Sequence, residues 1–120
     1  MEASLRTVII YARSVPRTVA FYSTHFGFVT TGEVSDGLVE LVAPHGAAGI
    51  LVHQAAKSVK LGQVGVKLSF HVQDVDAFVA DAKAQGLEFG PVHRANGYAF
   101  ANVKDPDKNS VSVSSRAPSV

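Results

Sequence analysis

The chain has 120 residues, of which 47% are hydrophobic and 18% are charged, with a net charge of +1 and no cysteine. This length suits one domain, and the hydrophobic content excludes a disordered chain. The lack of cysteine excludes disulfides and thiolate metal sites. The sequence has no basic stripe of the kind that would indicate a nucleic-acid partner. No apolar run approaches the roughly 20 residues that span a bilayer. The first residues lack a signal-peptide layout, so we expect a cytoplasmic protein.

The sequence repeats itself at an offset of 60 residues. Residues 7–15 and 67–75 both alternate apolar and polar side chains, a pattern typical of half-buried strands. Ser14 and Asp74 then occupy equivalent positions, where their side-chain oxygens are expected to cap a following helix. The matched order of strand and cap indicates an internal duplication.

Each cap is followed by a helical pattern that is expected to stop at a glycine, Gly27 in the first half and Gly86 in the second. The apolar positions recur every three or four residues, which predicts one buried stripe on each helix. These positions are Val15, Val19, Tyr22 and Phe26 in the first helix, and Val75, Phe78, Val79 and Ala82 in the second.

Three short strands are predicted after each helix, separated by turn signals. They cover residues 28–33, 38–43 and 48–54 in the first half, and 87–92, 98–104 and 110–115 in the second. The sequence therefore predicts one α+β domain over 1–120, with two tandem β-α-β-β-β modules at about 5–54 and 65–116 and a linker at about 55–64. The expected core residues are Val8, Ile10, Val19, Leu68, Phe70, Phe78, Val79, Val111 and Val113.

Two segments resemble a known family. Residues 20–28, AFYSTHFGF, are similar to the F-Y-x-x-x-L-G-F passage of the vicinal oxygen chelate superfamily of glyoxalases, bleomycin resistance proteins and dioxygenases. Residues 105–109, DPDKN, resemble its closing D-P-x-G-N turn, with Lys108 in place of glycine. A left-handed lysine costs about 1 kcal/mol, so we expect a rearranged turn. The resemblance implies a cup-shaped, mostly antiparallel sheet with the helices outside, and a homodimer.

The resemblance also places the superfamily's four metal-ligand positions at Thr7, Leu51, Lys67 and Ser112. Divalent metals prefer imidazole or carboxylate donors, whereas leucine offers none and a lysine ammonium repels a cation. We therefore expect no metal and no cofactor. His53, two residues after Leu51 and on the same face, is the one residue that would restore a site.

Strand alternation selects the side chains that would line the cup. The predicted ligand-binding residues are Thr7, Tyr11, Leu51, His53, Lys67, Ser69, His71, Phe100, Asn102 and Ser112. Lys67 would need an anionic partner there, so it marks a place for a carboxylate, phenolate or enolate of a ligand. The side of the strand that Glu40 faces is left open. His25, His45 and His93 are expected to face solvent.

Three functions remain open from the sequence. The first is a metal-free binding protein of the glyoxalase/bleomycin-resistance type, sequestering a small anionic or aromatic ligand as in antibiotic resistance. The second is a lyase, isomerase or dioxygenase-like enzyme, with an unusual metal site through His53 or metal-free acid/base chemistry by Lys67 or His71. The third is a cup that binds nothing. The replaced ligand positions favour the first, and the expected partner is a small molecule.

Overall fold

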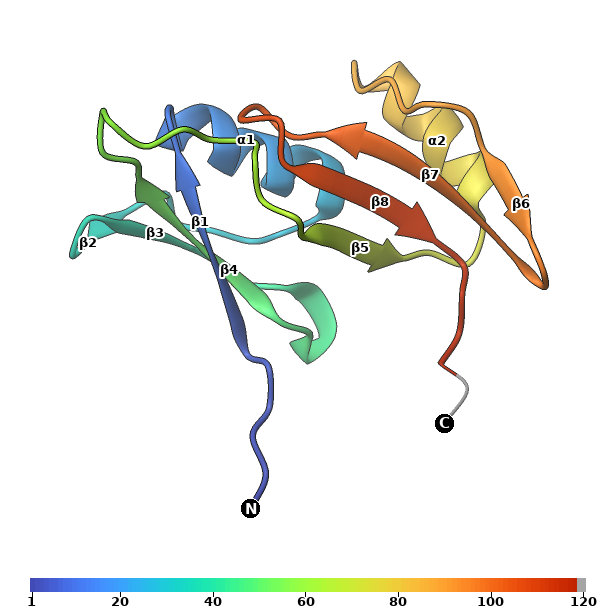
Figure 1. Cartoon of the computed structure of the whole chain (residues 1–120), viewed down its shortest axis with the longest axis horizontal. Coiled ribbons are helices and arrows are strands. Elements are labelled where there is room, and N and C mark those ends of the chain that lie inside the picture. The colour runs from blue at the N-terminus through green and yellow to red at the C-terminus, as the bar shows by residue number, and fades with distance from the viewer. Residues whose placement is uncertain (119–120) are drawn as a thin grey trace. The chain divides into compact units, whose positions relative to one another are not determined.

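The computed structural model describes residues 1–118, which form two compact units (Figure 1). The first unit spans Met1–Leu61 and the second begins at Gly62. Each contains one α-helix and one four-stranded sheet in the chain order β-α-β-β-β. The predicted α+β class and the tandem duplication are confirmed. None of the helices in the described part of the chain is long and apolar enough to cross a membrane.

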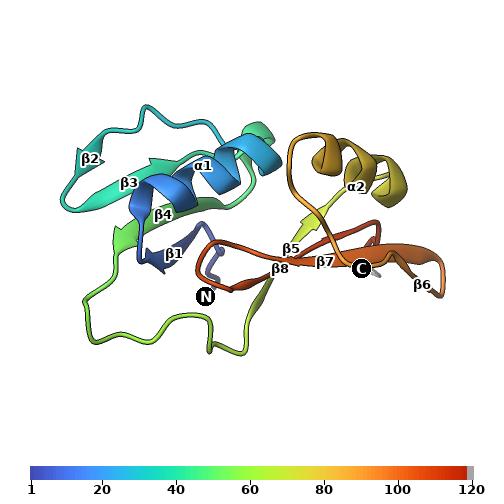
Figure 2. The same cartoon turned by 90° about the horizontal axis from the view of Figure 1, so that it is seen from above.

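The first unit contains sheet 1 and helix α1. Its elements are β1 (Thr7–Ala12), α1 (Val15–Phe26), β2 (Val34–Ser35), β3 (Leu38–Leu41), a 3-10 turn (Pro44–Gly46) and β4 (Gly49–Gln54). The strand order is β1-β4-β3-β2, with β1 and β4 parallel and the other pairs antiparallel. Helix α1 packs against β3 and β4 and lies along one face of the sheet (Figure 2).

The second unit repeats this arrangement with sheet 2 and helix α2. Its elements are β5 (Lys67–His71), α2 (Val75–Ala84), β6 (His93–Ala95), β7 (Tyr98–Lys104) and β8 (Ser110–Ser114). The strand order is β5-β8-β7-β6, again with one parallel pair, β5 and β8. Helix α2 packs against β7. Each sheet therefore keeps one face for its helix and leaves the opposite face to other contacts.

The predicted helix caps are confirmed. The Ser14 hydroxyl accepts a hydrogen bond from the amide three residues on at 3.3 Å, and the Asp74 carboxylate does the same at 3.0 Å. Gly27 ends α1 in the left-handed conformation, with φ of 76°. Gly86, with φ of 90°, follows α2 in the same way. Local chemistry therefore sets both ends of the two helices.

The strand predicted over 28–33 is wrong. Only Val29 forms a bridge there, to Val42, and the strand itself is β2, later in the chain. The hydroxyls of Thr30 and Thr31 accept hydrogen bonds from the amides two residues on, at 3.0 and 3.3 Å. These local bonds favour a turn at residues 30–33 over pairing with a neighbouring strand. The strand therefore forms later in the chain, as β2.

The strand predicted over 87–92 is also wrong, because strand β6 begins only at His93. Pro91 cannot donate to a ladder, so regular pairing cannot run through it. The amide of Gly90 instead makes a single bond to the carbonyl of Asn102 at 2.9 Å. In both halves, local hydrogen bonds or a proline therefore prevent a strand directly after the helix. The alternation of apolar residues does not reveal these local effects.

The predicted strand core is confirmed in part, and the buried side of α1 differs from the prediction. Ile10, Val111 and Val113 are buried, and the remaining predicted core residues are half-buried. Helix α1 buries Thr18, Phe21 and Tyr22, whereas Val15, Val19 and Phe26 of the predicted stripe are only half-buried. The buried side of α1 is therefore rotated toward Thr18 and Phe21, while Tyr22 belongs to both the predicted and the observed buried side.

The closing turn at residues 105–109 has a left-handed backbone at residue 108, where the superfamily pattern has glycine. Lys108 has φ of 67°, so the expectation of a rearranged turn is wrong. The reason is Asp105, which is 4% exposed. Its carboxylate accepts hydrogen bonds of 2.9 Å from the amides of Asp107 and Asn109 and from the Asn109 side chain. Charge-assisted bonds of this kind outweigh the strain at Lys108.

Replacing Lys108 by glycine should stabilise the protein. The change removes a left-handed side-chain penalty of about 1 kcal/mol and adds a smaller entropic cost of glycine in the unfolded chain. We expect the free energy of unfolding in urea to rise by about 0.5 kcal/mol. Lys60→Gly is the matched control, because Lys60 is not among the positive-φ residues and should lose stability. Equal or lower stability of Lys108→Gly would contradict the strain argument.

His25, near the end of α1, is half-buried, so the expectation that it faces solvent is wrong. Its ring lies edge-on to Phe21, with 5.6 Å between centroids. Its Nδ1 atom is buried and has no hydrogen-bond partner among residues 1–118. Burial lowers the pKa of His25 below its ordinary value of 6.5, because protonation would place an unpaired N–H in an apolar site.

This lowered pKa makes stability depend on pH. The unfolded chain binds a proton at His25 at a higher pH than the folded chain, so stability falls as the pH drops below 6.5. We expect the drop in melting temperature between about pH 7.5 and 5.5 to be smaller in His25→Gln than in the wild type. His45→Gln, in an exposed turn, is the control. Parallel pH profiles for wild type and His25→Gln would refute the assignment.

Candidate functional site

The face of sheet 1 opposite α1 carries the predicted site residues of the first half. We call it the mixed face; it contains Thr7, Ile9, Tyr11, Leu38, Glu40, Leu51 and His53. Strand register places Ile9 beside Leu51 and Tyr11 beside His53. Glu40 also lies beside Leu51, on the neighbouring strand, which settles the side that it faces. The buried residues of the same strands, such as Ile10, face the helix.

His53 is held in a defined orientation on the mixed face. Its Nδ1 atom lies 2.7 Å from the carbonyl oxygen of Gln54. A carbonyl only accepts, so Nδ1 donates, and in the neutral ring Nε2 remains the acceptor. The ring also packs against Tyr11, with 5.3 Å between centroids. His53 is therefore a positioned hydrogen-bond acceptor beside an exposed phenol.

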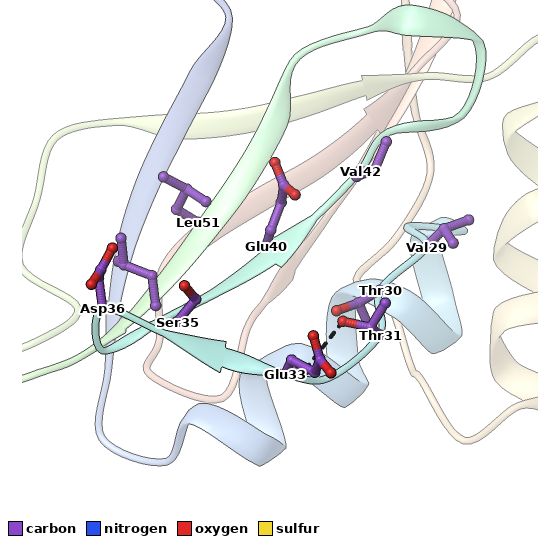
Figure 3. A pocket seen from close by; sticks show the side chains of 10 residues that line it. Val29, Thr30, Thr31, Glu33, Ser35, Asp36, Glu40, Val42 and Leu51 are labelled. Carbon is purple, nitrogen blue, oxygen red and sulfur yellow. Dashed lines mark hydrogen bonds between the residues drawn. The ribbon is translucent and has the colours of Figure 1, made fainter.

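A pocket of about 460 Å³ lies at the β2 and β3 side of sheet 1 (Figure 3). Its lining contains the three carboxylates of Glu33, Asp36 and Glu40 and no basic side chain. Figure 3 shows Glu40 and Leu51 coming from adjacent strands toward this space. Leu51 is the only predicted site residue in the lining. Its carboxylates disfavour an anionic ligand in this pocket.

The face of sheet 2 opposite α2 carries all the predicted site residues of the second half. We call it the polar face, and strand register arranges it in three rows. These are Lys67–Ser110–Lys104, Ser69–Ser112–Asn102 and His71–Ser114–Phe100, each written from β5 across β8 to β7. Consecutive rows are two residues apart, about 6.7 Å along the strands. His71 therefore lies roughly 13 Å from Lys67, at the other end of the face.

Hydrogen bonds link the first two rows. Lys67 Nζ donates to Asn102 Oδ1 at 2.9 Å, and Lys104 Nζ donates to Ser110 Oγ at 2.9 Å. The hydroxyl of Ser112, which is 4% exposed, donates to the Ser69 hydroxyl at 3.0 Å. Within residues 1–118, neither lysine has a carboxylate within 4.0 Å. Among the described residues, each of these exposed ammonium groups is therefore hydrogen-bonded to a neutral oxygen and not to a carboxylate.

The third row is aromatic. The His93 ring, on the edge strand β6, stacks on Phe100 with 5.0 Å between centroids and 30° between planes. His93 is exposed, as expected, and it is the first residue of strand β6. A pocket of about 370 Å³ lies at the opposite end of the face, lined by Lys67, Asn102, Val103, Lys104, Ser110 and Val111. The polar face thus combines cations and hydroxyls with an aromatic end.

The sequence analysis did not assign Lys104 or His93 to this face. The parity that selected Phe100 and Asn102 continues to Lys104, two residues on, so the signal was present in the sequence. His93 had no such signal, because its strand was predicted to end before it.

Residues 4–113 match the family model described as the Glyoxalase/Bleomycin resistance protein/Dioxygenase superfamily. The chain belongs to this superfamily. The suspected resemblance to the vicinal oxygen chelate proteins is therefore confirmed. No curated protein matches the chain.

Several solved structures are similar in fold. TnmS3, an antibiotic binding protein from Streptomyces sp. CB03234, is 15% identical, with a TM-score of 0.77 over 93% of this chain and 94% of the other. UcmS2 is 17% identical, with a TM-score of 0.80 over 97% and 100%. Lactoylglutathione lyase from Agrobacterium tumefaciens is 22% identical, with a TM-score of 0.72 over 95% and 94%. At these identities the likeness concerns the fold alone.

The side chains at the superfamily's metal-ligand positions do not fit a divalent metal. Leu51 has no donor atom, and Lys67 brings a positive charge. Ser112 Oγ is bonded to Ser69, and Thr7 lies at the exposed start of β1. Among the described residues, His53 is not part of any group of three or more His, Cys, Asp or Glu side chains placed to share a metal.

We accordingly expect the purified, untagged protein to contain no stoichiometric divalent metal. The measurement is elemental analysis of the protein as isolated, with a metal-dependent superfamily member prepared in parallel as a positive control. The expected zinc, nickel, manganese and iron contents lie far below one atom per chain, because the donor set cannot hold them. About one atom per chain would show that other side chains form a site.

Proposed function

We propose that the chain is a small-molecule binding protein that holds an anionic or aromatic ligand on the polar face of sheet 2 without a metal. The observation that carries this proposal is the Lys67 ammonium, whose only described bond goes to the neutral Asn102 amide. An ammonium has three donors, so two remain for a ligand. A cation without a carboxylate partner is a natural place for a ligand's anionic oxygen.

The surrounding groups suit such a ligand. The Ser69–Ser112 hydroxyl pair lies in the next row and supplies neutral hydrogen-bonding groups. The stacked His93–Phe100 pair supplies an aromatic surface at the far end of the face. Binding sites for small molecules combine apolar surface with a few fixed polar groups in this way. The fold likeness to TnmS3, an antibiotic binding protein, supports testing antibiotics first.

A thermal-shift screen tests the proposal broadly. The panel contains antibiotics and aromatic acids, each measured with chelator and with added divalent metal. A ligand that binds only the folded state raises the melting temperature. We expect stabilisation by at least one anionic aromatic compound, and the same shift in chelator. Stabilisation that appears only with metal would favour the enzyme with an unusual metal site.

Lys67→Met tests the assigned cation. Benzoate is the anionic probe and benzamide its neutral counterpart, both followed by calorimetric titration. A charge-assisted hydrogen bond contributes about 1.5–3 kcal/mol, and the exposure of Lys67 places it at the low end, so benzoate should weaken by about tenfold. Benzamide binding should not change. Lys83→Met, on α2 and away from the polar face, is the control.

Equal affinity of wild type and Lys67→Met for benzoate would remove Lys67 from the site. In that case its ammonium would serve only to bind Asn102, with its stem packed on the sheet.

We also propose that the protein forms a homodimer, as the resemblance to the superfamily implied. Apolar side chains such as Val29, Val34 and Val42 are 65%, 71% and 52% exposed. Association of two chains would remove such apolar surface from water. Light scattering at micromolar concentration should give about twice the monomer mass of 12.6 kDa. The monomer mass under these conditions would contradict the proposal.

A further inference from the structure

We infer that Lys67 and Lys104 together form a subsite for a doubly charged oxyanion, of the kind carried by a phosphate monoester. The inference rests on the proposed function and goes beyond it, because it adds a second cation and fixes the charge that the ligand should carry. Lys104 is the last residue of β7 and lies at the same end of the polar face as Lys67.

The two lysines share one row of sheet 2. Both lie opposite Ser110 of the central strand β8, Lys67 from β5 on one side and Lys104 from β7 on the other. Neighbouring strands are about 4.8 Å apart, so the two Cα atoms are roughly 10 Å apart. This separation leaves room for one small group between the two side chains.

Both side chains reach inward over the sheet. Lys67 Nζ crosses β8 to bond Asn102 Oδ1 on β7, and Lys104 Nζ reaches back to Ser110 Oγ on β8. The two ammonium groups therefore lie over the same pair of strands, β7 and β8. Their hydrogen bonds hold them there without neutralising either charge, because both acceptors are neutral.

Two like charges brought together without a counter-charge repel each other, and an anion between them removes that cost. No carboxylate among residues 1–118 lies within 4.0 Å of either ammonium. A monocarboxylate would balance one of the two charges, whereas a phosphate monoester would balance both. The charge count therefore favours the dianion.

The space at this end of the face suits the group. The pocket of about 370 Å³ is lined by both lysines together with Ser110 and Asn102, and its size is within the range of small-molecule sites. A phosphate monoester offers three acceptor oxygens, which can receive N–H bonds from both ammonium groups and an O–H bond from Ser110. The organic part of the ester would extend along the face toward Phe100.

Calorimetric titration with phenyl phosphate and benzoate tests the subsite, at low ionic strength to limit screening. We expect the wild type to prefer phenyl phosphate. Lys104→Gln should weaken phenyl phosphate by about tenfold, between the effects of an exposed ion pair and of a charge-assisted bond, and benzoate by about twofold or less. Lys104→Arg keeps the charge and should keep the preference. Lys83→Gln, on α2, is the matched control.

The outcomes separate this inference from the proposed function. Unchanged phenyl phosphate affinity in Lys104→Gln, or equal losses for both ligands, would overturn the two-lysine subsite. The proposed function is tested separately, by the change in benzoate affinity in Lys67→Met. No binding of phenyl phosphate at concentrations on the order of 10 mM would also overturn the subsite. The melting temperature of each variant confirms that it is folded, so a loss of binding is read as a loss of contacts.

Discussion

Successive side chains of a β-strand point to opposite faces, and each sheet of this chain packs its own helix against one face. This alternation decides which side chains meet the helix and which remain for a ligand. In sheet 2 it buries Val111 and Val113 and puts Lys67 and Ser112 on the opposite face. A shift of one residue in the pairing of β5 with β8 would exchange the two faces. The polar face therefore depends on the parallel register of these two strands.

On the polar face, a lysine stands at a position where the superfamily resemblance places a metal ligand. In the proposed function, the side chain of Lys67 supplies the positive charge at this position without a set of metal ligands. An ammonium polarises an oxygen less than a divalent ion does, so it suits binding better than bond breaking. The neutral partners Asn102 and Ser110 orient the two ammonium groups of the face without neutralising them. This charge arrangement distinguishes sheet 2 from sheet 1, whose pocket contains carboxylates instead.

Strands β1 and β5, the helix caps and the duplication of this chain could be predicted from its sequence. Alternation located β1 and β5, side-chain oxygens located the caps at Ser14 and Asp74, and the offset of 60 residues located the second module. The same parity predicted which face of each sheet carries the candidate site residues. The strands and caps depend on neighbours in the sequence, and the repeat is visible when the two halves are compared, which is why the sequence predicts them.

The errors came from contacts that are distant in the sequence or local to the backbone. The start of β6 depends on Pro91 and on one bond to Asn102, and the inward face of α1 depends on where Phe21 and Tyr22 find room. The turn at Lys108 depends on the Asp105 carboxylate, whose burial no local pattern indicates.

The central claim is that an anionic ligand binds the polar face of sheet 2 through its lysines and without a metal. The most direct measurement is a two-dimensional ¹H–¹⁵N NMR titration of chelator-treated protein with benzoate. We expect the largest shifts at the amides of Lys67, Ser69, Asn102 and Ser112. Shifts centred on Glu33, Asp36 and Glu40, or shifts that appear only after a divalent metal is added, would contradict the claim.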